Sequence, residues 1–341
     1  MLPQSRTGAR IFAGLHIRCV IEGGGRLTTP STGIDERRTP RSPVWPRPSA
    51  DPFDTGRESS RFRGPARRCL GAPRPPGHPE TMEDVQSSPD PRGLLLEKAG
   101  VSGLRLPVVA FGQGTVASVA LSVSVPASQR GAHMSRFLPV LEAHREALDL
   151  PRVLRLLADL QTALDAERAD VELRFPFFRD KAAPVSGERG LMAYDAVIRG
   201  TAQVGSAPRL SLEAIVAVAS LCPCSKAISD YGAHNQRGHV HVEIEPTITD
   251  GAPAAIGLDH LVTVAERHAS TPLYPVLKRP DERHVTMLAY DRPAFVEDMT
   301  RGVALDLRED PRVAAFRVRV VNQESIHDHD AFAELSWRRG A

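Results

Sequence analysis

The strongest constraint on the fold is an order of strand and helix patterns that occurs twice, about 105 residues apart. Apolar and polar residues alternate over residues 119–125 and 171–175, which is the period of a half-buried strand. A helix is predicted between them, beginning at Pro151, with apolar residues at helical spacing up to Leu164. Residues 189–204 are predicted to form the hairpin partner of the second of these strands.

The second half of the chain repeats this order. Strands are predicted at 214–218, 239–245, 316–320 and 330–338, and helices at 258–265 and, behind Pro293, at 296–307. The residues themselves do not repeat clearly. The sequence therefore indicates a duplicated order of two strands, two helices and two strands.

The first 92 residues have a different composition. Pro, Arg, Gly and Ser dominate from about residue 20, and no apolar period is present, so this segment cannot bury enough surface to offset its chain entropy. We interpret residues 1–92 as a disordered extension, with Met82 as an alternative start. A Pro-rich ligand for a partner or a targeting arm is the other interpretation.

The composition excludes several classes of protein. The net charge of +2 provides no global field for nucleic acid or an anionic membrane, and no apolar run approaches the roughly 20 residues that span a bilayer. Four cysteines in 341 residues do not resemble a disulfide framework. Because the first residues make a poor signal peptide, we predict a cytoplasmic protein.

The segment from Ser220 to Glu243 contains the clearest chemical pattern. Cys222 and Cys224 are two apart, so that an extended backbone would direct both thiols to the same side, and His234 follows twelve residues after Cys222. A thiolate and an imidazole brought together by a loop are good ligands for Zn²⁺ or a similar metal. A redox-active pair, or small buried cysteines, is equally compatible with the spacing alone.

Two further segments carry ionisable residues. Residues 273–286 contain Lys278, Arg279 and Glu282, although charge runs are most often solvated surface, and residues 322–334 place His327 just after a strand. Histidines 239 and 241 share a strand face that we assign to solvent or to a subunit contact. One set would complete a mixed metal-ligand shell: Cys222, His234, Glu282 and His327.

Taken together, five segments resemble the type IB GTP cyclohydrolase I family of bacterial folate and pterin synthesis. They are SLCPCSK (220–226), GAHNQR (232–237), LKRPDE (277–282), FVED (295–298) and ESIHDHDAFA (324–333). The resemblance covers about residues 95–338, and the first two segments are the most specific. It implies an α+β fold of tandem tunnelling folds (T-folds), two ββααββ units with antiparallel sheets and helices on one face. Their predicted bounds are 93–205 and 206–341. It also implies a homotetramer with active sites between subunits.

The resemblance also implies roles for particular residues. Cys222, His234, Glu282 and His327 match the catalytic metal site, and Glu297 matches the glutamate that holds the guanine ring, since a carboxylate can accept hydrogen bonds from its N1–H and 2-amino group. The cysteine favours Zn²⁺, while a carboxylate also suits Mn²⁺ or Fe²⁺. Candidates for binding the triphosphate are Lys226, Arg237, Lys278 and Arg279.

The implied reaction begins with water adding to C8 of GTP and ends with dihydroneopterin triphosphate and formate. A metal can lower the pKa of the water, and one histidine can serve as proton shuttle instead of ligand. Two alternatives stay open: the related nitrile reductase of queuosine synthesis, which consumes NADPH, and a non-catalytic metal-binding scaffold. The sequence does not indicate a role for Cys224.

Overall fold

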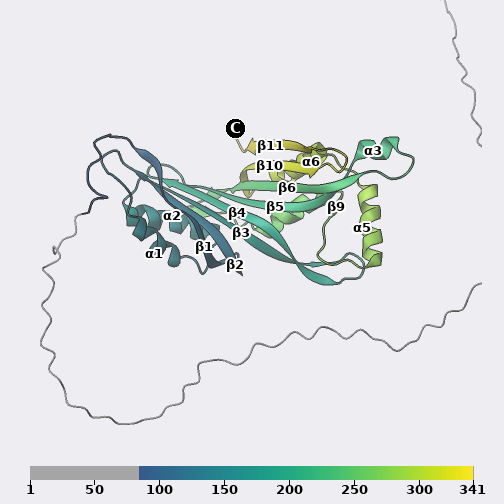
Figure 1. The fold of residues 1–341 in the computed structure, drawn as a ribbon, viewed down its shortest axis with the longest axis horizontal. Coiled ribbons are helices and arrows are strands. Elements are labelled where there is room, and N and C mark those ends of the chain that lie inside the picture. The colour runs from purple at the N-terminus through teal and green to yellow at the C-terminus, as the bar shows by residue number, and fades with distance from the viewer. Residues whose placement is uncertain (1–83, 341) are drawn as a thin grey trace, which may run out of the picture. The chain divides into compact units, whose positions relative to one another are not determined.

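The computed structural model describes residues 84–340 (Figure 1). Their long strands form one antiparallel sheet. Its order is β1 (Leu96–Ala110), β2 (Gln113–Val125), β3 (Arg168–Ala182), β4 (Arg189–Gln203), β5 (Arg209–Leu221), β6 (Asn235–Pro246), β10 (Val313–Gln323) and β11 (Asp330–Arg338). The short β9 (Thr271–Pro272) pairs with β5, and β7 (Ile248–Thr249) pairs with β8 (Ala252–Pro253) in a separate ribbon.

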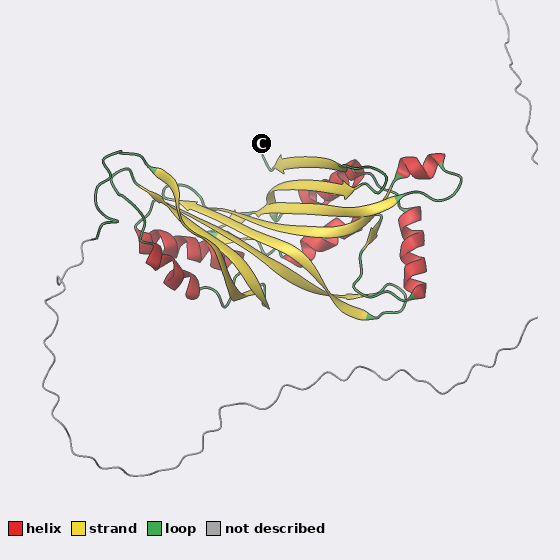
Figure 2. Cartoon of the chain, viewed as in Figure 1, coloured by secondary structure: helices red, strands yellow, loops and turns green. Residues whose placement is uncertain are grey.

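The helices connect these strands (Figure 2). A 3₁₀ turn (Met134–Arg136), α1 (Phe137–Glu142) and α2 (Leu150–Leu164) lie between β2 and β3, and α3 (Pro223–Ile228) lies between β5 and β6. Three more helices precede β10: α4 (Leu258–Arg267), α5 (Arg279–Asp291) and α6 (Val296–Glu309). No helix in residues 84–340 is long and apolar enough to cross a membrane.

Local sequence explains how α2 begins and ends. Asp149 caps the helix by accepting a hydrogen bond from the Arg152 N–H at 2.8 Å, and Pro151 occupies the first turn. Asp165 ends the helix in the left-handed conformation with φ of 51°. Leu157 and Leu160 are fully buried in the same core as Leu173 of β3, so the apolar stripe of α2 covers the first half of the sheet.

In the second half of the chain, the apolar stripes of α4 and α6 cover the sheet. Val262 of α4 and Met299 and Val303 of α6 are fully buried with Val240 of β6 and Val318 of β10. The predicted strands and helices are confirmed, because each lies within an observed element of the same type, except that the strand predicted at 189–204 extends one residue beyond β4. The core therefore forms where the sequence alternation predicts it.

The predicted fold class, however, is wrong. Two ββααββ units with helices on one face were expected, but β4 pairs with β5 from Asp195↔Ile215 to Thr201↔Arg209, so that both halves share one sheet. The second half also contains four helices, and α3 and α5 lie beyond the ends of β5 and β6 (Figure 1). Pro223 and Pro280 explain these two additions, because proline favours the first turn of a helix.

The domain bounds stay a prediction. The boundary between residues 205 and 206 lies in the turn between β4 and β5. Most of the predicted extension, residues 1–83, lies outside the described residues. Residues 84–92 are described, and there the carbonyl groups of Gln86 and Ser88 accept hydrogen bonds from the backbone N–H groups of Gly131 and Arg130 at 3.2 and 3.0 Å.

Candidate active site

The ends of β5 and β6 bring two of the predicted metal ligands together. Cys222 directly follows β5 and His234 directly precedes β6, and Leu221 pairs with Asn235 between them. The Cys222 N–H donates a hydrogen bond to the His234 carbonyl at 3.1 Å. The antiparallel pairing therefore closes the loop from Cys222 to His234, and the two residues meet at one end of the sheet.

Cys222 is the N-cap of α3. Its Sγ accepts a hydrogen bond from the Ser225 N–H at 3.4 Å, and the residue is half-buried. Cys224 lies inside the helix and is exposed. The prediction that an extended backbone directs both thiols to the same side is wrong, because Pro223 begins a helix between them.

The ring of His234 lies near two polar side chains, one on β6 and one just after β10. Its Nδ1 lies 2.9 Å from Oε1 of Gln236 on β6 and 3.8 Å from Oε2 of Glu324, which follows β10. Glu324 is thus close to His234, although the sequence pattern assigned it no role beyond membership of a histidine-rich segment. The structure therefore joins the cysteine segment to the segment after β10.

Glu282 lies in the first turn of α5 and is exposed, whereas its neighbour Asp281 is fully buried. Asp281 accepts hydrogen bonds from the N–H groups of Val185, Ser186 and Lys278 at 2.8, 2.9 and 2.9 Å, and from the Ser186 hydroxyl at 2.6 Å. Although burial opposes ionisation, these hydrogen bonds hold the pKa of Asp281 far below its ordinary value. No structural role was predicted for Asp281 from the sequence. Its position three residues after the N-cap Lys278 is the available sequence signal.

His327 lies in the turn between β10 and β11, exposed, with its ring stacked on His329 at a centroid distance of 4.9 Å. Within residues 84–340, no three His, Cys, Asp or Glu side chains are placed to hold one metal ion. The chain thus brings Cys222 and His234 together but does not bring Glu282 and His327 to the same point. Thiolate and imidazole are ligand types of zinc sites, and the two residues that carry them are joined here by a backbone hydrogen bond.

The candidate residues for substrate binding fall into two groups. Lys226 donates a hydrogen bond to the Tyr290 carbonyl at 2.5 Å, with its ammonium group 4.2 Å from the Tyr290 ring centroid, and Lys278 pairs with Glu188. These two lysines therefore have partners within the chain, and the contact of Lys226 ties α3 to α5. The other three candidates are exposed: Arg237, Arg279 and Glu297 in the first turn of α6.

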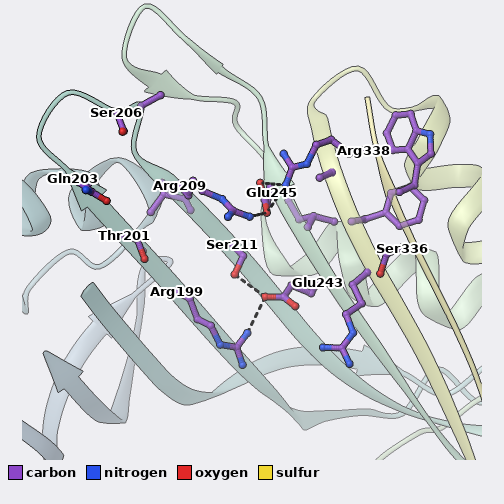
Figure 3. Close-up of a pocket in the computed structure, with 18 of the residues that line it drawn as sticks. Arg199, Thr201, Gln203, Ser206, Arg209, Ser211, Glu243, Glu245, Ser336 and Arg338 are labelled. Atoms are coloured by element: carbon purple, nitrogen blue, oxygen red, sulfur yellow. Dashed lines mark hydrogen bonds and ion pairs between the residues drawn. The ribbon is translucent and has the colours of Figure 1, made fainter. Parts of the chain in front are cut away.

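A cavity of about 850 Å³ lies on the sheet, and no predicted site residue lines it (Figure 3). Its arginines are paired with carboxylates: Arg199 contacts Glu243 at 3.0 Å, and Arg209 contacts Glu245 at 2.6 Å. Because these charges are already neutralised by neighbours, the cavity offers no uncompensated group for catalysis. The predicted site residues Cys222 and His234 lie instead at the end of β5 and β6.

Comparison with known proteins identifies the family of this chain. The profile described as type I GTP cyclohydrolase FolE2 matches residues 82–333. The chain belongs to this family. GTP cyclohydrolase FolE2 of Neisseria meningitidis is 45% identical over 261 residues, which cover 75% of this chain and 85% of the relative. The protein of the same name from Neisseria gonorrhoeae is 45% identical, with 75% and 98% covered.

A third relative, GTP cyclohydrolase FolE2 1 of Dechloromonas aromatica, is 44% identical, with 74% of this chain and 95% of the relative covered. The resemblance inferred from the five segments is thereby confirmed at the level of the family. Among solved structures, a uricase from Arthrobacter globiformis is similar, with a TM-score of 0.44 and 8% identity over 72% of this chain and 94% of that one. A likeness at this level bears on neither fold nor function.

Proposed function

We propose that this chain is a GTP cyclohydrolase that converts GTP to 7,8-dihydroneopterin triphosphate and formate. Membership of the FolE2 family and 45% identity to proteins named GTP cyclohydrolase support the reaction. The observation that carries the assignment of the site is the pairing of Cys222 with His234 at the end of β5 and β6. These two residues are the centre of the chemistry.

A divalent metal, Zn²⁺, Mn²⁺ or Fe²⁺, is part of this proposal. The thiolate of Cys222 and the imidazole of His234 would hold it, with Glu282 and His327 as further ligands or as acid–base groups. When bound there, a divalent metal would supply a nucleophilic water at neutral pH for addition to C8 of the purine. Thiolate and imidazole favour Zn²⁺, and a carboxylate in the shell also suits Mn²⁺ or Fe²⁺.

The remaining roles fall to side chains of this chain. The exposed carboxylate of Glu297 would accept two hydrogen bonds from the guanine N1–H and 2-amino group. Arg237 and Arg279 are exposed and would contact the triphosphate, together with Lys226 and Lys278. Protons for ring opening and closure would move through whichever of Glu282 and His327 does not bind the metal.

The proposal includes a homotetramer with active sites between subunits. Two large side chains of the segment between Cys222 and His234 are exposed, Ile228 by 84% and Tyr231 by 95%. Large exposed apolar side chains beside a site that one chain does not complete favour coverage by a second copy. The cytoplasmic location and the lack of a nucleic-acid or membrane partner stay predictions from the sequence.

The test uses the full chain, stripped of metal and then supplied with Zn²⁺, Mn²⁺ or Fe²⁺ in turn. Formate and the fluorescent pterin formed after oxidation are measured with GTP as substrate. We expect metal-dependent product, and we expect Cys222→Ser to lower formate release roughly 10²–10³-fold with an unchanged circular dichroism spectrum. A folded sample that binds GTP but releases no formate with any metal would contradict the proposal.

A further inference from the structure

Three buried polar side chains gather behind His234, each from a different strand. Ser220 comes from β5, Gln236 from β6 and Asn322 from β10, and all are buried. A buried polar group needs hydrogen-bond partners, so the partners available here decide how each side chain is turned. The orientation of Gln236 determines what it presents to His234.

Ser220 acts as an acceptor toward its neighbours. Its single hydroxyl proton is donated to the Ala294 carbonyl at 2.9 Å, so its other contacts must be accepted. Nδ2 of Asn322 donates to Ser220 Oγ at 2.9 Å, and Nε2 of Gln236 approaches the same oxygen at 3.5 Å. Ser220 therefore favours the amide nitrogen of Gln236 on its side.

Glu324 imposes the same orientation. An ionised carboxylate can only accept hydrogen bonds, and its Oε1 lies 3.5 Å from Nε2 of Gln236. With its nitrogen facing two acceptors, the Gln236 amide turns its oxygen toward His234, where Oε1 lies 2.9 Å from Nδ1. An amide oxygen has no proton to donate, so the hydrogen on this bond must belong to Nδ1 of His234.

We infer that Gln236 is a positioning residue that keeps a hydrogen on Nδ1 of His234, so that the neutral ring presents the lone pair of Nε2. From the sequence, His234 could be either a metal ligand or a proton shuttle. This tautomer suits a ligand, because the lone pair on Nε2 is available to a metal. Partners that fix the second ring nitrogen of a metal-binding histidine typically strengthen metal affinity 10–100-fold. The connection to metal rests on the proposed function, whereas the tautomer does not.

The tautomer is tested on the metal-free full chain by long-range ¹H–¹⁵N NMR of histidine-labelled protein at mildly alkaline pH. The His234 signal is assigned from its loss in His234→Gln. We expect the Nδ1–H form in the wild type and a shift toward Nε2–H in Gln236→Met. The matched control is Gln113→Met, because Gln113 also uses both amide atoms, in bonds of 2.8 and 3.0 Å to Phe178. A wild type in the Nε2–H form, or an unchanged Gln236→Met spectrum, would overturn the inference.

The consequence for metal is tested by chelator competition for Zn²⁺. We expect Gln236→Met to bind Zn²⁺ roughly 10–100-fold more weakly, with Gln113→Met unchanged. The double variant Gln236→Glu/Glu324→Gln should recover affinity, because residue 236 still accepts from Nδ1 and residue 324 now donates to it. Equal affinity of Gln236→Met and wild type would contradict a positioning role. If the wild type bound no Zn²⁺, the metal in the proposed function would be lost and the NMR result would still decide the tautomer.

Discussion

Asp281 and Glu282 are adjacent residues of the same type in opposite environments. Successive side chains on a helix point in different directions, so the burial of Asp281 against the β3–β4 turn leaves Glu282 exposed. Three of the four hydrogen bonds of Asp281 join the start of α5 to Val185 and Ser186, and the fourth caps the helix at Lys278. The direction in which Glu282 points therefore depends on its neighbour.

We expect Asp281→Asn to lower the melting temperature at pH 7 by roughly 5 °C or more, because one amide oxygen replaces two charged acceptors. The pKa of Asp281 is lowered in the folded state, so its contribution is complete above the ordinary value of 3.8 and declines as pH falls below it. Melting curves at pH 7 and pH 3 should show the difference between variant and wild type shrinking. Glu282→Gln, with an exposed side chain, is the control and should change the melting temperature little. A difference that stays constant with pH would contradict the role of the charge.

The residues identified from the sequence and those missed differ in where their partners lie. Cys222 and His234 stand in a distinctive local segment. Gln236 and Asn322 are each one of several polar residues in their strands, and each is set apart by a contact with Ser220 of another strand. The alternation along one strand does not show which polar residue at a strand end will be buried by residues about 100 positions away.

At the level of elements, periodicity predicted the helices that cover the sheet and missed those that do not. Leu156, Leu157 and Leu160 are among six buried residues of α2, whereas only Asp281 and Ala289 are buried in α5. A helix with almost no buried apolar stripe leaves no periodic pattern. The charged run 278–284 was therefore interpreted as surface, although it begins a helix that carries a predicted site residue.

Contacts with the first half of the chain fix the segment that leads into α5. Lys181 of β3 donates to Glu266 of α4 at 2.5 Å and to the Leu273 carbonyl at 2.6 Å, and Tyr194 of β4 donates to Glu266 at 2.9 Å. The side chains of Lys181 and Glu266 are only 11% and 10% exposed. Burial lowers the pKa of Lys181 and, together with the Glu266 charge, raises that of Tyr194. This buried pair joins β3 and β4 to α4 and the approach to α5.

We expect Lys181→Met to lower the free energy of unfolding by about 3–5 kcal/mol, because Glu266 stays buried and keeps only the longer contact with Arg179, at 3.8 Å. The double variant Lys181→Met/Glu266→Gln should recover more than half of this loss, since the amide oxygen introduced at position 266 still accepts from Tyr194 and no charge is left unpaired. Arg189→Met removes an exposed pair with Asp180 and should cost less than about 1 kcal/mol. Urea denaturation measures all three. Equal losses in the single and double variants would contradict the ion-pair account.

On the scale of the whole molecule, the single sheet could not be predicted from the repeated element order. That order is equally compatible with two separate sheets, and the choice is made by β4 and β5, which pair across a short turn. Among the described strands, β1 and β11 each have one neighbour and form the two edges of the sheet. The proposed metal site at the end of β5 and β6 is likewise incomplete, because one chain, over its described residues, does not place three His, Cys, Asp or Glu side chains around one point.

Active sites built from two copies predict complementation between inactive variants. If Cys222 of one chain works with His327 of another, then Cys222→Ser and His327→Gln should each be inactive alone. Co-expressed in equal amounts, they should restore about a quarter of wild-type formate release per chain, the share of random chain pairs that joins two intact residues. The control pairs Cys222→Ser with His234→Gln, whose positions adjoin within one chain and should not complement. No recovery in the first pair, from mixed assemblies confirmed by mass spectrometry, would place His327 in the same chain as its Cys222.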